Sequence, residues 1–244
     1  MAKWLRLSFV DFRFLLKAKE LWIAIAVVML YTCALSIYSI NASQQRTMDY
    51  YYQIINDLSF YVFIIVPSFI LSKDYAFKTT RILYTGPFSK LEVVSSKFFS
   101  VLMFYVIASV VHRVSANSLW IIDQHVFSVE LLWSQLPKTM AIYLLIGVFV
   151  CSLAFFVTLA TYSRMATIIV MLTIFIMEKY LRGILLLIFP NEDLKILLTH
   201  NPIAIAFEAL QYGTLTLMDG AIVVFTSVII SLLVFLVLKR REIN

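Results

Sequence analysis

The sequence of 244 residues has little charge and few residues that interrupt helices. Only 14% of its residues are charged and 62% are hydrophobic, whereas a soluble domain has about 25% charged and about 45–50% apolar residues. Glycine and proline occur five times each, which argues against a glycine-rich channel and favours long, unbroken helices. The composition therefore predicts a membrane protein whose helices cross the bilayer several times.

Residues that carry out chemistry are also scarce. Two cysteines, Cys33 and Cys151, both fall in apolar runs, which predicts buried thiols and no disulfide framework. The sequence has no G-x-x-x-x-G-K-[ST] motif to bind nucleotide phosphates, and its three histidines, His112, His125 and His200, do not have metal-ligand spacing. We therefore expect no catalytic, metal or cofactor site on this chain, and we do not expect it to be an enzyme by itself.

Residues 3–20 have the pattern of a basic amphipathic helix. Charged side chains recur at spacings of three, four and seven residues and so share one helical face: Lys3, Arg6, Arg13, Lys17 and Glu20. The other face carries Leu5, Phe9, Phe12 and Leu16. Such a helix lies in the membrane interface with its cations toward anionic headgroups.

Six apolar segments are long enough to cross about 30 Å of hydrocarbon. We place them at residues 21–40, 54–71, about 98–120, 138–162, 165 onward and 220–238. We expect residues 41–53 to form a polar loop with an interfacial tyrosine run, Tyr50 to Tyr52, and residues 121–137 to form an interfacial loop. Arg164 marks a tight turn between the fourth and fifth spans.

The cations indicate the orientation. Of the 20 lysines and arginines, 14 fall in residues 3–19, in residues 73–97, at Arg164 and at the C-terminal end, whereas the opposite loops contain only Arg46, Lys138 and Lys195. The positive-inside rule therefore places both termini and residues 73–97 in the cytoplasm. The net charge of +6 follows from this topology and needs no nucleic-acid partner.

Residues 73–97 form the longest polar interruption between apolar blocks. Within them, Ser89 and Glu92 are spaced as a capping box, in which the serine caps a helix and the glutamate bonds back to the cap's N–H. The preceding residues include an apolar group, Ile82, Leu83 and Tyr84, in a polar context. We interpret this segment as a docking loop that ends at the start of the third helix.

Residues 190–219 are more structured than a simple loop requires. Asn201 and Pro202 have the pattern of an N-cap followed by proline at the first helical position, and Gly213 suits the position after the last turn. Asn191, with the apolar residues from Leu194 to Leu198, predicts another short helix before it. We expect both helices to dip into the outer leaflet.

Charges inside the apolar spans are candidates for a substrate path, because burying them is costly. They are His112 and Arg113 in the third span and Glu178, Lys179 and Arg182 in the fifth. Glu178 and Arg182 lie four residues apart, so they can pair on one helical face. The alternative is that the fifth span ends near Met177 and these side chains extend to the outer interface.

The order of these parts resembles the permease subunit of a type-2 ABC exporter, over essentially the whole chain. The family's loop pattern is matched by Asp74, Thr79, Ile82, Leu83, Pro87, Phe88, Ser89, Lys90 and Lys97. The sequence departs from the pattern at Asp74, where glutamate is usual, and at Lys78 and Ser96, where glycine is common. In length and style the chain is also similar to permeases that export amphipathic peptide toxins, the phenol-soluble modulins.

The resemblance implies an all-α membrane protein with a single transmembrane domain over residues 1–244. Its parts would be six transmembrane helices, the interfacial helix at residues 3–20, a cytoplasmic coupling loop at residues 73–97 and two short external helices within residues 190–219. It implies a bacterial plasma-membrane location, a second copy of the permease or a related chain, and contact with lipid.

The resemblance further implies a separate ATPase subunit that binds ATP and Mg²⁺. Its cleft would receive a set of coupling residues, namely Asp74, Lys78, Arg81, Ile82, Leu83, Tyr84 and Pro87. The substrate would be an amphipathic peptide or another hydrophobic molecule. Two other classes stay open: a secondary transporter or channel, and a membrane immunity or sensor subunit that binds an antimicrobial without moving it.

Overall fold

The computed structural model describes residues 3–41, 47–76, 89–124, 129–189 and 191–240. Within these ranges the chain forms nine α-helices and no strand. In chain order they are α1 (Lys3–Lys17), α2 (Lys19–Asn41), α3 (Met48–Ala76), α5 (Lys90–Gln124), α6 (Val129–Thr161), α7 (Arg164–Ile188), α8 (Glu192–Thr199), α9 (Pro202–Tyr212) and α10 (Leu217–Arg240). The all-α prediction is therefore confirmed for this part of the chain.

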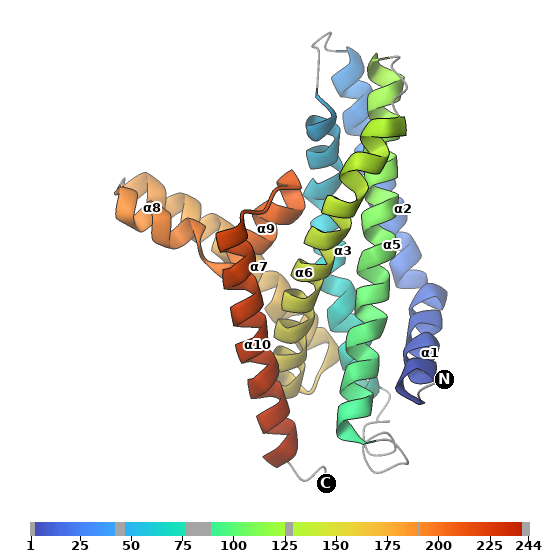
Figure 1. Cartoon of the computed structure of the whole chain (residues 1–244), viewed down its shortest axis with the longest axis vertical. Helices are drawn as coiled ribbons and strands as arrows, with labels where there is room; N and C mark the ends of the chain where they lie inside the picture. Colours follow the sequence, from blue (N-terminus) through green and yellow to red (C-terminus); the bar gives the residue numbers. More distant parts are fainter. Residues whose placement is uncertain (1–2, 42–46, 77–88, 125–128, 190, 241–244) are drawn as a thin grey trace.

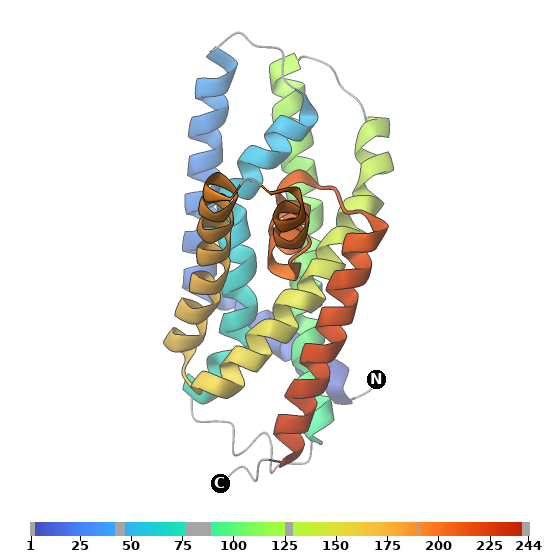
Figure 2. The same cartoon turned by 90° about the vertical axis from the view of Figure 1, so that its left-hand side faces the viewer.

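Helix α3 is the centre of the bundle and packs against α2, α5, α6, α7 and α9 (Figures 1 and 2). Its sequence explains this position, because apolar residues occur on every side of it, and Phe60, Phe63, Ile64 and Ile70 are all buried. A helix that is apolar all round is stable only when other helices surround it or when lipid does. α2 and α10, by contrast, lie at the periphery, and each keeps most of its apolar surface exposed.

Two expected loops are largely helical in the residues that the structure describes. The tyrosine run at residues 50–52 belongs to the first turns of α3, where Tyr51 and Tyr52 are buried in the bundle. The prediction of an interfacial loop at residues 121–137 is also wrong for the described residues, because α5 continues to Gln124 and α6 already begins at Val129. Pro137 is the ninth residue of α6, and a proline inside a membrane helix is tolerated where neighbouring groups satisfy the freed backbone carbonyl.

Five of the described helices are long and apolar enough to cross a membrane: α2, α3, α5, α6 and α10. The predicted fifth span, α7, is not among them, although it forms one continuous helix of 25 residues. Its C-terminal half carries Glu178, Lys179 and Arg182, so its apolar stretch is interrupted by three charges. The six-span topology is therefore not confirmed.

The tight turn before α7 is present as expected. Ser163 caps α7 by accepting a hydrogen bond from the Ala166 amide, and Tyr162 adopts a positive φ of 51° to reverse the chain. From this turn α7 leans away from the bundle, and α8 projects to its side (Figure 1).

The two short helices after α7 have the predicted caps. The side chain of Asn191 accepts a hydrogen bond from the Asp193 amide, and that of Asn201 accepts one from Ile203. Gly213 ends α9 in the left-handed region, at φ 65°, as its predicted position requires. α9 packs against α3 and α6, and α8 has no buried residue.

Both ends of the described chain lie toward the same end of the bundle as the C-terminal end of α3 and the N-terminal end of α5 (Figure 1). The described parts of the cation-rich segments therefore lie toward one end of the bundle. Of the two cysteines, Cys151 is buried as expected, but Cys33 is exposed because it lies on the outer side of α2. Its expected burial was wrong because an apolar helix at the edge of the bundle exposes most of its residues.

Candidate functional site

Helix α1 does not have the two faces that its sequence predicts. Its buried face consists of Ser8, Asp11, Phe12 and Leu15, and this face packs against α5. Phe9 and Leu16, which we expected to share a face with Phe12, are exposed. The helix therefore has three surfaces, one toward the bundle, one apolar and exposed, and one basic and exposed.

Packing of α1 on α5 uses specific contacts. The Ser100 hydroxyl donates a hydrogen bond of 2.9 Å to the Ser8 backbone carbonyl, and the rings of Trp4 and Phe99 meet edge to face at 5.5 Å. Such contacts fix the register between the two helices. The N-terminal helix is therefore part of the bundle and not only a membrane anchor.

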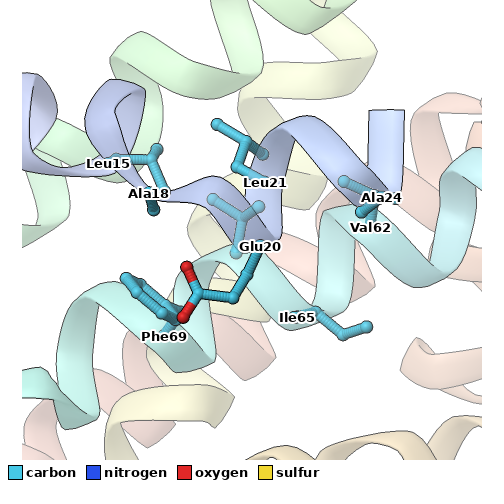
Figure 3. Close-up of a pocket in the computed structure, with 9 residues that line it drawn as sticks. Leu15, Ala18, Glu20, Leu21, Ala24, Val62, Ile65 and Phe69 are labelled. Carbon is cyan, nitrogen blue, oxygen red and sulfur yellow. The ribbon is translucent and has the colours of Figure 1, made fainter. Parts of the chain in front are cut away.

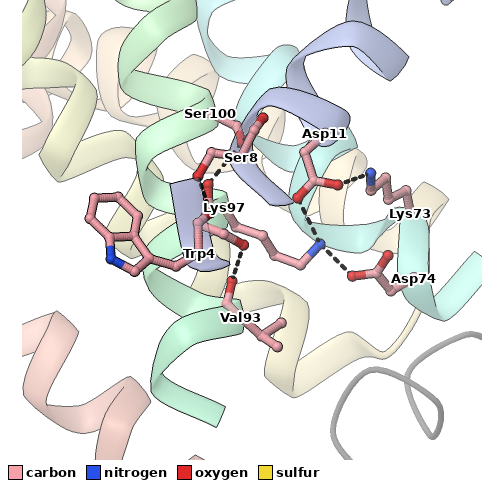
Figure 4. Close-up of polar contacts among 9 residues, drawn as sticks. Trp4, Ser8, Asp11, Lys73, Asp74, Val93, Lys97 and Ser100 are labelled. Carbon is pink, nitrogen blue, oxygen red and sulfur yellow. Dashed lines mark hydrogen bonds and ion pairs between the residues drawn. The ribbon is translucent and has the colours of Figure 1, made fainter. Parts of the chain in front are cut away.

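Four buried charges meet where α1, α3 and α5 converge, and we call them the basal charge cluster: Asp11, Lys73, Asp74 and Lys97 (Figure 4). Lys73 forms an ion pair with Asp11, and Lys97 forms one with Asp74. The Lys97 ammonium also lies 4.0 Å from the second oxygen of Asp11. Because two lysines face two carboxylates, the cluster is neutral, which makes its burial possible.

The basal charge cluster flanks both ends of the expected coupling loop. Lys73 and Asp74 lie near the end of α3, and Lys97 lies in the second turn of α5. The intervening residues 77–88 lie outside the described part of the chain. The cluster therefore ties the helix that enters this segment to the helix that leaves it, and ties both to α1.

The start of α5 has the predicted capping box. The Ser89 amide donates a hydrogen bond of 2.8 Å to the Glu92 carboxylate, and the Glu92 amide donates one of 3.1 Å to the Ser89 hydroxyl. Two backbone N–H groups that lack a partner within the helix are thus satisfied. The first turn of α5 is fixed at the point where the chain leaves residues 77–88.

The structure describes only one of the expected coupling residues. Asp74 lies inside α3 and is buried in the basal charge cluster, whereas we expected it to lie in a cytoplasmic loop. Helix α3 continues past residue 71 because its polar C-terminal end packs against α1 and α5. The other coupling residues lie outside the described residues: Lys78, Arg81, Ile82, Leu83, Tyr84 and Pro87.

The intramembrane charges fall into two separate groups. The first surrounds His112 and Arg113, which are both buried in α5. The His112 Nδ1 atom lies 2.8 Å from the Tyr143 hydroxyl, and the Arg113 guanidinium lies over the ring of Tyr52 at 5.5 Å. The Asn56 side chain accepts a hydrogen bond of 3.3 Å from Tyr143 and donates one to the Leu210 carbonyl, which connects this group to α9.

The second group joins α7 to α9. Arg182 pairs with Glu178 at 3.3 Å, as the spacing predicts, and also with Glu208 of α9. The Lys179 ammonium lies 4.7 Å from the centre of the Phe207 ring. The side chains of Glu178 and Arg182 are only 8% and 13% exposed, so they are packed against protein rather than extended outward.

Within the described residues, no hydrogen bond or ion pair joins these two groups directly. Sequence reasoning missed their neutral partners, Asn56 and Tyr143, because single polar residues in apolar helices give no periodic signal. It also missed Asp11, for which a signal exists. Asp11 is the one acidic residue in residues 3–17, on a helix otherwise suited to an anionic surface.

A small hollow lies at the bend between α1 and α2, against α3 (Figure 3). Its volume is about 40 Å³, which has room for roughly one or two waters. Glu20 lies at its edge and pairs with Arg164 at 3.6 Å, and the Arg164 guanidinium lies 3.8 Å from the centre of the Phe69 ring. The hollow is too small for a substrate, and no group of acidic, histidine and cysteine residues in the described chain could hold a metal ion.

Comparison with known families identifies the class of the protein. Residues 15–178 match the family described as "ABC-2 family transporter protein", which covers about two-thirds of the chain. The chain belongs to the ABC-2 transporter family. This ABC-2 chain is thus a membrane subunit of a transporter, and the matched region runs from the end of α1 to Glu178 of α7. Comparison with curated proteins gives no match.

Proposed function

We propose that this ABC-2 chain is the permease of an ATP-driven exporter in a bacterial plasma membrane. ATP and Mg²⁺ would bind to a separate ATPase subunit, and two copies of the permease, or this chain and a related one, would form the path. The family match supports the permease role. The basal charge cluster is the observation that supports coupling through residues 77–88.

Mechanical coupling requires that a push on the loop moves helices as a unit. In this chain both ends of the segment 77–88 are tied together by Lys97 and Asp74, and both are tied to α1 through Asp11. The capping box makes the first turn of α5 rigid. A force on the loop would therefore reach α1, α3 and α5 together instead of unwinding one helix end.

The docking contact itself would come from residues 78–87. Ile82, Leu83 and Tyr84 would supply apolar anchors, because buried apolar and aromatic groups contribute most of the energy of an interface. Lys78 and Arg81 would add charge contacts. The excess of cations in residues 3–19 and 73–97 supports a cytoplasmic position for this surface.

The proposed substrate is an amphipathic peptide or another hydrophobic molecule that partitions into the bilayer. The exposed apolar surfaces of α2 and α10 support a lateral route between two copies of the chain. α8 and α9 would lie at the outer leaflet, with α9 held to α7 by the pair of Arg182 and Glu208. The charged and ionisable residues inside the helices would shape the path mainly by fixing the helices around it. They are His112, Arg113, Glu178, Lys179 and Arg182.

Co-purification with an ATPase subunit tests this proposal. The full chain is expressed with its neighbouring genes, extracted in mild detergent, and compared with Leu83→Asp and with Leu197→Asp, a control at an exposed leucine of α8. We expect a stoichiometric ATPase with the wild type and the control, and its loss with Leu83→Asp. A folded chain without a nucleotide-binding partner would contradict the proposal and favour a self-contained path or a sensor.

A further inference from the structure

A cavity of about 150 Å³ lies among α2, α3 and α5. Its inner wall is formed by buried apolar side chains, among them Val28, Phe63 and Phe104. Met29, Ile107 and Val111 also line it, and each is about half exposed. The cavity therefore opens on the outer surface of the bundle, between α2 and α5.

The surface around this opening is apolar. Other exposed apolar residues lie within a few positions of the lining residues in the sequence, namely Val27 and Leu30 of α2 and Val114 of α5. α2, α3 and α5 are all long and apolar enough to span a membrane, so the opening faces acyl chains when the protein is inserted. Only molecules dissolved in the bilayer can then reach it.

His112 is the one ionisable residue that lines the cavity. The side chain is 3% exposed, and its Nε2 atom has no hydrogen-bond partner in the described part of the chain. A buried polar atom without a partner is rare in folded proteins, because the loss of hydration is not compensated. Besides the hydroxyls of Ser59 and Ser115, the cavity thus presents one buried ring nitrogen that a ligand can satisfy.

The neighbouring hydrogen bonds determine what that group requires. Asn56 donates through its amide nitrogen to the Leu210 carbonyl, so its amide oxygen is left to accept from the Tyr143 hydroxyl. Tyr143 has a single proton, and when it gives this proton to Asn56 its oxygen accepts a hydrogen bond from His112 Nδ1, 2.8 Å away. The Nε2 atom of a neutral His112 then carries a lone pair and needs a hydrogen-bond donor.

We propose that this cavity binds a membrane-dissolved molecule that has an apolar chain or ring and a hydroxyl group that donates to His112 Nε2. An apolar cavity of similar size stays dry and takes up a molecule as large as benzene. A longer ligand therefore inserts one end and leaves the remainder among the lipid acyl chains. The lining contains no charged side chain apart from His112 when it is protonated, so an uncharged alcohol fits it better than an ion.

This site does not depend on the proposed transport reaction, and its test needs no ATPase. The full chain in lipid vesicles is photolabelled with octanol carrying a diazirine, and in parallel with the methyl ether of the same alcohol, which has no hydroxyl proton. Labelling of each lining residue is measured by peptide mass spectrometry. It is normalised to labelling of Leu233 and Leu236, exposed on α10, to correct for partitioning into the membrane.

We expect the alcohol to label Met29, Ile107 and Val111 about tenfold more than the ether does. His112→Phe should abolish this preference, and Ala108→Phe, which fills the cavity, should reduce labelling by both probes. Val111→Trp at the exposed opening gives a second block that leaves the core intact, and Ile229→Phe on α10 serves as the control. Equal normalised labelling by alcohol and ether, unaffected by these changes, would overturn the proposal and indicate ordinary lipid contact.

Discussion

The Lys97 ammonium of α5 lies 4.0 Å from the Asp11 carboxylate of α1, and both side chains are buried. Lys97 simultaneously pairs with Asp74 of α3, so one cation connects three helices. A buried cation of this kind requires partners of opposite charge, because its removal from water costs several kcal/mol. Its partners are therefore interdependent, and loss of one charge leaves the others unbalanced.

Replacement of Lys97 by methionine should destabilise the protein strongly. The change leaves two buried carboxylates with only Lys73 to balance them, and breaking one partner of a buried pair costs about 3–5 kcal/mol. Thermal unfolding in detergent measures the effect. The double variant Lys97→Met, Asp74→Asn should regain part of the stability, because it restores charge balance.

Lys138→Met is the control for this experiment, since Lys138 is exposed. The melting temperature of the control should stay close to that of the wild type. If Lys97→Met also melted like the wild type, the basal charge cluster would not stabilise the junction of α1, α3 and α5.

Gly147 and Gly183 offer a matched pair of glycine-to-alanine changes. A Cβ atom at Gly147 would lie 2.8 Å from Tyr105 Cγ, so alanine must push apart α5 and α6 at a cost of about 1–3 kcal/mol. A Cβ atom at Gly183 would meet nothing within 4 Å, and alanine there should stabilise α7 by about 0.5–1 kcal/mol. Melting temperatures should therefore shift in opposite directions, and equal shifts would contradict the close α5–α6 packing.

Arg182→Met should loosen α9 from α7. The substitution leaves Glu178 and Glu208 facing each other without the cation that joins them, and Glu178 is largely buried. Hydrogen exchange in α9 should then accelerate by at least about tenfold, the factor that corresponds to about 1.4 kcal/mol. Lys195→Met, at an exposed position of α8, should leave the exchange of α9 unchanged.

Ser89→Ala should weaken the start of α5. The serine hydroxyl caps the Glu92 amide, and loss of such a cap costs about 0.5–2 kcal/mol. Amide hydrogen exchange at the first turn of α5 should rise several-fold, whereas Ser118→Ala, which removes a hydroxyl from an exposed position inside the same helix, should not change it. Unchanged exchange in both variants would show that packing alone fixes this helix end.

Helix caps could be predicted from the sequence because they are local. Each cap involves only residues that are close in sequence, and each was found where the spacing indicated: Ser89 with Glu92, Asn201 with Pro202, and Gly213. The Glu178–Arg182 pair is local in the same sense, since both residues lie on one helix. Apolar segments also gave the approximate positions of the helices, although helix ends differ by several residues from the prediction. At residues 50–52 the bundle covers Tyr51 and Tyr52, and at residues 121–124 the helix simply continues into the polar segment.

The sequence by itself determined that this chain is a helical membrane protein, because its composition and the length of its apolar segments leave few other ways to satisfy the backbone. Only the tertiary structure decided which polar residues meet. Asp11 joins Lys73 across 62 positions, and Tyr143 joins His112 across 31, so no local spacing could indicate either pair. Such contacts depend on how helices pack, and packing is set by the whole set of side chains between them.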